Sequence, residues 1–353
     1  MIQLDLRSLS HSQLTELVTS WGEPSYRADQ IYNWLYRHFV LTVDEMTNLP
    51  AALRQRLAKE TSLSTIRISQ RQYSKDKSAT KLLFSLPDGQ AVEGVLLKYR
   101  KWFSACLSSQ AGCRMGCAFC ASTLGGLVRH LTVGEMMGQL VLLSREAKNM
   151  GGEVRSLVLM GTGEPLDNYN NVLAFLAQAA NPAGLNLSYR RVTLSTCGLV
   201  PGIRRLANEG LPLTLAVSLH APTDDLRSEL MPINKVYPLA ELMSACRYYS
   251  ETTHRRITFE YALLDNVNDG LDKAQQLARL LKGMLCHVNL IPFNPVAERS
   301  FCRSSSSRVE AFYQVLQQEG ISVTVRRELG SDITAACGQL RRRRLAKGAA
   351  SYD

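Results

Sequence analysis

Strand-like and helical patterns alternate from residue 103 to residue 320, and this alternation restricts the chain to few architectures. Short apolar runs predict six strands, at 103–110, 154–160, 190–196, 213–219, 256–264 and 286–293. Helical patterns follow them in turn, at 132–149, 170–180, 201–210, 239–250, 271–283 and 306–320. Near-continuous apolar strands that alternate with helices are typical of a parallel sheet covered by helices. Six such units are fewer than the eight of a closed barrel. We therefore predict an α/β fold, an open partial (β/α)6 barrel, with a doubly wound sheet as the alternative.

The chain before residue 103 has other patterns. Helices are predicted at 11–21, where Ser10 serves as the cap, and at 26–39 and 49–60. Two strand-like runs, 80–86 and 91–99, flank the turn signal PDGQ and predict a hairpin. We expect four parts. They are a helical N-terminal accessory domain at 1–75, which contacts RNA or acts as a packing cap, a β-hairpin extension at 76–102, the barrel with its C-terminal segment at 103–340, and a basic tail at 341–353.

Composition indicates the kind of partner and the cellular compartment. The 353 residues are 45% hydrophobic, enough for a large core, and carry a net charge of +10. That charge indicates a polyanionic partner such as nucleic acid, or a generically basic surface. The N-terminus lacks the apolar region of a signal peptide, and no apolar run is long enough to span a bilayer. We expect a cytoplasmic protein, and in a reducing cytosol clustered cysteines bind metal or act in catalysis more often than they form disulfides.

The run CRMGCAFC holds three thiols, Cys113, Cys117 and Cys120. A structural zinc site takes four ligands, and Cys106 or His130 could complete one here. A [4Fe–4S] cluster held by only three cysteines would instead leave one iron open to an external ligand. Because the run follows the first barrel strand, where the active-site loops of barrels lie, we favour a catalytic cluster.

Residues that end or follow several other predicted strands, most of them polar or glycine, lie at the same edge of the sheet. They are Gly163 and Glu164 after the second strand, Ser195 on the third, Ser218, Leu219 and His220 on the fourth, and Asn294 after the sixth. Taken alone, His220 would be interpreted as a packed core histidine. Glu93 interrupts the apolar run at 91–99 and, by the two-residue period of a strand, lies on the same inward face as Val95 and Leu97. A carboxylate on an inward face is either paired structurally or functional.

Together these motifs resemble a known family. CxxxCxxC after the first strand of a partial barrel is similar to the signature of radical S-adenosylmethionine (SAM) enzymes. A wider set of motifs resembles the RlmN-type adenine C2-methyltransferases over about Glu93 to Arg343: CLSSQAGCRMGCAFCAST, GTGEPLDNY, LSTCGLVP, SLHAPTDDLR, MPINK, LLDNVND, NLIPFNP and GSDITAACGQLRR.

The resemblance implies two cofactors, a [4Fe–4S] cluster and SAM, of which two molecules are used per turnover. Cys113, Cys117 and Cys120 would ligate the cluster, and Phe119 could shield it. The SAM contacts would come from the strand-end set: Gly163, Glu164, Ser195, Ser218, Leu219, His220 and Asn294. Electron transfer into SAM would release a 5′-deoxyadenosyl radical.

The same resemblance assigns two more cysteines and a carboxylate. Cys337 would accept a methyl group from one SAM, and the radical from a second SAM would take a hydrogen from that S-methyl group before the carbon radical adds to C2 of adenine. Cys106 would then release the product by a transient disulfide with Cys337, and Glu93 would be the proton acceptor. We interpret Cys197, Cys246, Cys286 and Cys302 as small buried residues.

The implied substrates are an adenine of 23S rRNA and the adenine 3′ of the anticodon in tRNAs. An electron donor such as flavodoxin or ferredoxin, a monomeric state and no membrane partner are expected. Candidate phosphate contacts, or plain solvated charges, are Arg190, Arg191, Arg255, Arg256 and the run Arg341 to Arg344. Two alternatives stay open: Cfr-type methylation of adenine C8, and a non-catalytic, zinc-stabilised RNA-binding protein.

Overall fold

The computed structural model describes residues 3–63, 66–100, 102–327, 329–330 and 333. Its main sheet contains seven parallel strands: β6 (Trp102–Cys106), β9 (Val154–Leu159), β10 (Val192–Thr196), β11 (Thr214–Ser218), β12 (Ile257–Leu263), β13 (Cys286–Pro292) and β14 (Val323–Val325). Their spatial order is their order along the chain. A doubly wound sheet reverses direction part-way, so that alternative is wrong and the open partial barrel is confirmed.

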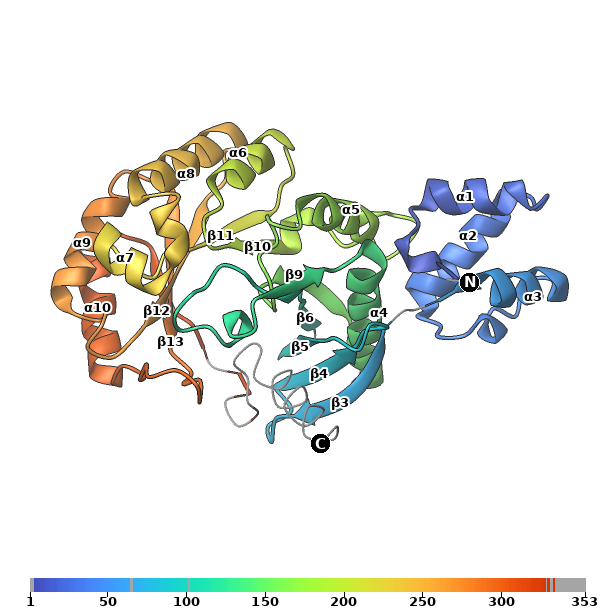
Figure 1. Ribbon diagram of the computed structural model, residues 1–353, viewed down its shortest axis with the longest axis horizontal. Helices are drawn as coiled ribbons and strands as arrows, with labels where there is room; N and C mark the ends of the chain where they lie inside the picture. The colour runs from blue at the N-terminus through green and yellow to red at the C-terminus, as the bar shows by residue number, and fades with distance from the viewer. Residues whose placement is uncertain (1–2, 64–65, 101, 328, 331–332, 334–353) are drawn as a thin grey trace.

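Helices cover the outer face of these strands (Figure 1). They are α4 (Val133–Asn149), α5 (Tyr169–Ala180), α6 (Val200–Asn208), α7 (Asp224–Leu230), α8 (Leu239–Thr253), α9 (Leu271–Leu281) and α10 (Ser306–Gln318). Parallel crossovers are almost always right-handed, so a sequential strand order keeps the helices on one side and leaves the inner face free. Some details differ from prediction. The first strand ends at Cys106 rather than at 110, and β14 and α7 were not predicted.

An antiparallel extension continues the sheet beyond β6 through β5 (Ala91–Tyr99), β4 (Ala79–Ser85) and β3 (Arg67–Tyr73). The predicted hairpin is confirmed in β4 and β5. The helical interpretation of the chain up to about residue 75 is wrong at 67–73, which is strand β3. This strand lies at the sheet edge with mostly exposed side chains, so it lacks the apolar pattern that identifies a strand.

The N-terminal segment forms α1 (His11–Ser20), α2 (Tyr26–Asn33), a π-helical turn at Trp34–His38, and α3 (Ala51–Glu60). Its ends meet where β1 (Leu4–Asp5) pairs in parallel with β2 (Thr61–Ser62). The predicted cap is confirmed, since the Ser10 hydroxyl accepts from the Gln13 N–H. These helices lie beside α4 and α5 (Figure 1) and share one hydrophobic core with the barrel. The boundaries of the four predicted parts stay a prediction.

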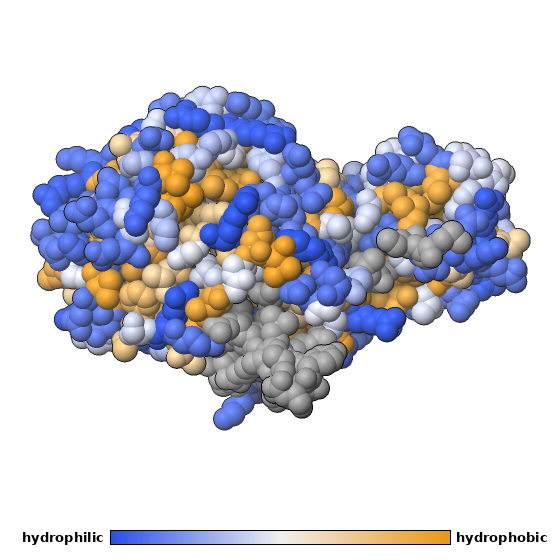
Figure 2. All heavy atoms as spheres, viewed as in Figure 1, coloured by the Kyte–Doolittle hydropathy of each residue, from blue (hydrophilic) through white to orange (hydrophobic). Residues whose placement is uncertain are grey.

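On the face shown in Figure 2, hydrophilic residues predominate along the upper edge, where α6 and α8 lie. Among the described residues, no helix combines the length and the apolarity needed to cross a membrane.

Candidate active site

One cavity of about 1180 Å³ lies against the inner face of the barrel. Most predicted site residues line it: Cys106, Cys113, Cys117, Cys120, Gly163, Glu164, Ser195, Ser218, His220 and Asn294. They come from the carboxyl ends of parallel strands or from the loops that follow them, where barrel active sites lie. Its volume is above the common range for a single small ligand, about 300–1,000 Å³, so two bound groups could share it.

The three-cysteine loop is folded back by a small antiparallel ladder, β7 (Gln110–Gly112) and β8 (Leu127–His130). Gly112 has φ +85°, and a Cβ atom there would collide with the Gly126 carbonyl oxygen. Beside this close approach, the Cys113 N–H donates to the same oxygen at 2.9 Å. The loop is also tied to α7, because the Ala118 N–H donates to the carbonyl of Leu230 at 2.8 Å.

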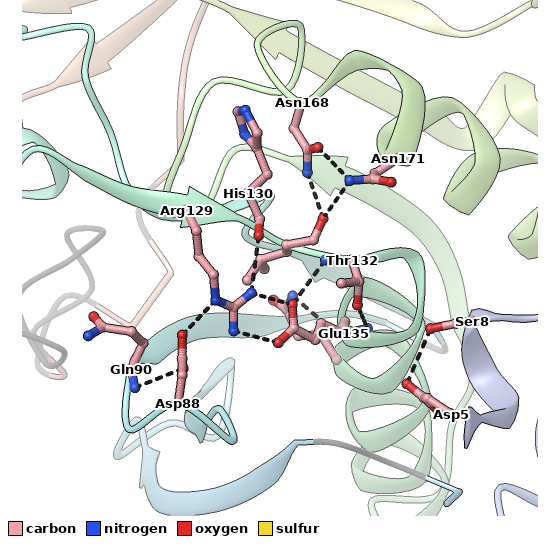
Figure 3. Close-up of polar contacts among 12 residues, drawn as sticks. Asp5, Ser8, Asp88, Gln90, Arg129, His130, Thr132, Glu135, Asn168 and Asn171 are labelled. Carbon is pink, nitrogen blue, oxygen red and sulfur yellow. Dashed lines mark hydrogen bonds and ion pairs between the residues drawn. The ribbon is translucent and has the colours of Figure 1, made fainter. Parts of the chain in front are cut away.

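Arg129 of strand β8 ties this ladder to neighbouring elements (Figure 3). Its guanidinium donates to both oxygens of Glu135, at 2.8 and 2.7 Å, and to Asp88 at 2.6 Å. Glu135 forms the capping box of α4 with Thr132, and Asp88 lies in the β4–β5 turn. The Asn168 amide donates to the Leu131 carbonyl at 2.8 Å. The cysteine loop is therefore braced against α4, α5 and the extension.

The thiols lie in an apolar surrounding. Cys117 belongs to a buried cluster with Cys197, Met231 and Phe293, and Phe119 packs against it. Burial raises the pKa of Cys113 to about 12 and raises that of Cys117 further, so both are protonated until a cation displaces the protons.

The donor set fits a cluster better than a single ion. Within the described residues, no three His, Cys, Asp or Glu side chains converge tightly enough to hold one metal ion. A [4Fe–4S] cluster distributes its thiolate ligands over separate irons, so its cysteines need not meet at a point.

Gly163 and Glu164 form one wall of the cavity. Gly163 has φ +114°, and a Cβ atom there would lie 2.6 Å from the Gln110 Cβ. The Glu164 carboxylate accepts from the N–H groups of Leu166 and Cys197 at 3.0 and 2.7 Å. Burial raises the pKa of Glu164. A buried carboxylate held by backbone donors is suited to receive a ligand ammonium group.

His220 is held in the left-handed region at φ +57°. Its Nδ1 accepts from the Ala262 N–H at 2.9 Å, so the proton of the neutral ring is on Nε2. Burial lowers the pKa of His220 to about 3. The ring meets Phe119 edge-on at 4.9 Å. Leu219 does not line the cavity; its N–H donates to the Glu260 carbonyl at 3.0 Å.

Sequence reasoning missed Arg227 of α7, which is fully buried. Its guanidinium donates to the carbonyls of Cys197 at 2.7 Å and of Ser218 and Leu219 at 3.3 Å, where β10 and β11 end. It also donates to the Asn234 side chain at 2.9 Å. No local pattern distinguishes Arg227 from an exposed helical arginine.

Glu93 is buried and forms an ion pair with Lys81 at 2.6 Å. It is not among the described residues that line the cavity, so its role as proton acceptor stays a prediction. Cys106 lines the cavity, whereas Cys337 lies outside the described residues.

The four remaining cysteines do not behave alike. Cys246 and Cys286 are buried as predicted. Cys302 is exposed, so its prediction is wrong; it lies in a loop after β13. Cys197 is buried and also lines the cavity.

Four of the predicted phosphate contacts lie at the strand ends opposite the cavity residues. Arg190 and Arg191 precede β10, and Arg255 and Arg256 precede β12, at the ends opposite Ser195 and the other cavity residues. None of these four lines the cavity. Arg341 to Arg344 lie outside the described residues.

Comparison with known proteins agrees with this geometry. Residues 4–63 match the ribosomal RNA large subunit methyltransferase N-terminal domain, and residues 107–280 match the radical SAM superfamily. The chain is 52% identical over 339 residues to the probable dual-specificity RNA methyltransferase RlmN of Symbiobacterium thermophilum, covering 96% of this chain and 91% of that protein. The chain belongs to the RlmN family. It is therefore a radical SAM RNA methyltransferase, as the motifs predict.

Other RlmN relatives and a solved structure extend over the same length. The probable RlmN of Desulforamulus reducens is 53% identical, with 97% of each chain covered. The crystal structure of a radical SAM methyltransferase from Sphaerobacter thermophilus superposes with a TM-score of 0.93 at 46% identity, covering 95% of this chain and 98% of that one. Because residues 107–280 of this chain match the radical SAM superfamily, the zinc-stabilised, non-catalytic alternative is not supported.

Proposed function

We propose that this protein methylates C2 of an adenine in 23S rRNA and of the adenine 3′ of the anticodon in tRNAs. The observation that carries the proposal is a single cavity lined by Cys106, the three clustered cysteines and the polar residues of successive strand ends. The relatives named dual-specificity RNA methyltransferases support two RNA substrates.

Cys113, Cys117 and Cys120 would hold the [4Fe–4S] cluster, with one iron left for SAM. When bound, the cluster and SAM supply a 5′-deoxyadenosyl radical. The protein's residues orient that chemistry. Glu164 would receive the ammonium group of SAM, and the apolar residues around the thiols would exclude water from them.

The covalent steps would use Cys337 and Cys106. The Cys337 thiolate accepts a methyl group from the SAM sulfonium, which leaves as the neutral thioether. That methyl group would lose one hydrogen atom to the 5′-deoxyadenosyl radical, and its carbon would then bond to C2 of adenine. The Cys106 thiolate would next attack the Cys337 sulfur. A sulfur–sulfur bond forms as the sulfur–carbon bond breaks, and the released carbon takes a proton. Before that exchange, the adduct would lose one electron, which the oxidised cluster would accept, and the C2 proton, which Glu93 would accept. Two electrons from the donor would later reduce the disulfide.

The cellular partners are also part of the proposal. We assign the enzyme to the cytoplasm, as a monomer that receives electrons from a flavodoxin or ferredoxin.

Regiochemistry is the first experimental test. Cluster-loaded protein is incubated without oxygen with SAM, a reductant and ribosomal RNA, and the digested nucleosides are compared by mass spectrometry with 2-methyladenosine and 8-methyladenosine standards. We expect 2-methyladenosine, and none from Cys337→Ala. Formation of 8-methyladenosine would assign the Cfr-type reaction instead, and RNA without any methyladenosine would reject the proposal.

A further inference from the structure

Two aromatic rings stack where β5 turns into β6. Tyr99 and Trp102 pair across this turn, with ring centroids 4.6 Å apart and planes inclined by 14°. Both residues line the cavity that holds the cysteines. Tyr99 is 41% exposed. The comparable pair Tyr261–Phe312 is fully buried in the core. Packing alone therefore explains the core pair but not the exposed one.

Cationic side chains surround this aromatic pair. Lys98 and Arg100 flank Tyr99, and Arg326 and Arg327 follow β14. All four line the same cavity and are exposed. In the part of the chain that the structure describes, none of the four forms a salt bridge, in contrast to Arg129 and Arg308. We call Lys98, Tyr99, Arg100, Trp102, Arg326 and Arg327 the aromatic–cationic rim.

Two acidic residues, Asp76 and Glu260, also line the cavity near the rim, and Glu260 interacts electrostatically with Arg326. Asp76 accepts from the Ser74 hydroxyl and the Ser78 N–H at 2.6 and 3.0 Å within the β3–β4 turn. The four cations of the rim outnumber these two carboxylates, so the net charge around the aromatic pair is positive and suits an anion.

We propose that the aromatic–cationic rim binds the nucleotide next to the target adenine, with its base stacked on the Tyr99–Trp102 pair and its phosphate on the cations. The inference rests on the proposed function and assigns the RNA-binding part of that site. An adenine that enters the cavity must leave its stack, and its neighbour then loses a stacking partner. Proteins that bind unpaired RNA supply aromatic faces and positive charge at such positions.

The test measures binding of an anticodon-arm RNA hairpin that contains the target adenine. Tyr99→Ala and Trp102→Ala should each weaken binding about tenfold, the usual effect of losing one base–aromatic stack. Trp102→Phe should restore most of the affinity. Arg326→Ala and Arg327→Ala should each lower the slope of log affinity against log salt by about 1. The matched control is Tyr248→Ala on the outer helix α8, whose hydroxyl bonds only to Asn208 among the described residues.

Crosslinking gives a second readout that does not depend on stability. A 5-iodouridine placed beside the target adenine should crosslink to a peptide that contains Tyr99 or Trp102. If the variants bind the hairpin with wild-type affinity and the crosslinks form elsewhere, the rim proposal is wrong. Binding and crosslinking need no turnover, so the absence of methyladenosine would reject the proposed function without affecting this result.

Discussion

At the scale of single residues, the charges of the site are held mainly by backbone groups. Glu164 accepts from two backbone N–H groups, and Arg227 donates to three carbonyl oxygens at the ends of β10 and β11. Such contacts fix both the side chain and the strand ends. The sequence predicted Glu164 because it follows a strand, but it could not predict Arg227, whose partners come from segments distant in sequence.

Replacing Arg227 tests this support. Arg227→Met leaves buried carbonyl oxygens without donors, and each costs about 1–3 kcal/mol. We expect the free energy of unfolding to fall by at least ~3 kcal/mol in urea titrations followed by circular dichroism. Arg204→Met, at an exposed arginine of α6 that contacts Ser244, should change it by less than about 0.5 kcal/mol. Equal effects of the two substitutions would contradict the supporting role.

The low pKa of buried His220 leads us to expect that the free energy of unfolding depends on pH. Its pKa is about 3 in the folded chain and near 6.5 when unfolded. Between pH 7.5 and 5.5 only the unfolded state gains this proton, so stability falls as pH falls, by ~1.4 kcal/mol. His220→Asn should remove that part of the decline. His254→Asn is the control, because His254 is exposed and has a similar φ of +53°. An unchanged pH slope in His220→Asn would refute the assignment.

If Cys106 releases the product, its removal should trap the covalent adduct between Cys337 and RNA. Without its thiol, the bond between Cys337 and RNA cannot be exchanged for a disulfide, so Cys106→Ala should accumulate a covalent protein–RNA adduct, visible on denaturing gels. Cys302→Ala, at an exposed cysteine, should form none. Normal turnover by Cys106→Ala would exclude the resolving role.

At the scale of elements, the parallel strands were predictable because strands that are buried on both faces have nearly continuous apolar sequences. The edge strand β3 and the β7–β8 ladder were not, since the first is polar and the second is too short to show a period. That ladder nevertheless positions the first cysteine, through the close approach of Gly112 to Gly126.

Gly112→Ala tests the ladder. An alanine in this left-handed conformation costs about 1–2 kcal/mol before any collision, so Cys113 should be displaced. We expect clearly less iron per chain and weaker absorbance near 400 nm after anaerobic reconstitution. Gly125→Ala is the matched control, because no atom lies within 4 Å of its added Cβ. Full iron loading of Gly112→Ala would contradict the role of the ladder.

At the scale of the whole molecule, the site depends on contacts between parts that are far apart in sequence. Gln178 of α5 donates to the carbonyls of Arg7 and Leu9 at 3.1 and 3.0 Å, joining the N-terminal helices to the barrel. The convergence of strand-end residues in one cavity could be predicted from the order of strands and helices. The aromatic–cationic rim could not, because it joins the β5–β6 turn to the end of β14.

The central claim is that this cavity holds a three-cysteine cluster that cleaves SAM and methylates RNA. The most direct measurement is the joint release of 5′-deoxyadenosine and formation of 2-methyladenosine, by anaerobically cluster-loaded protein with reductant and ribosomal RNA. The account predicts both products from the wild type and neither from Cys117→Ala. Iron-loaded protein that splits no SAM, even with its RNA present, would contradict it.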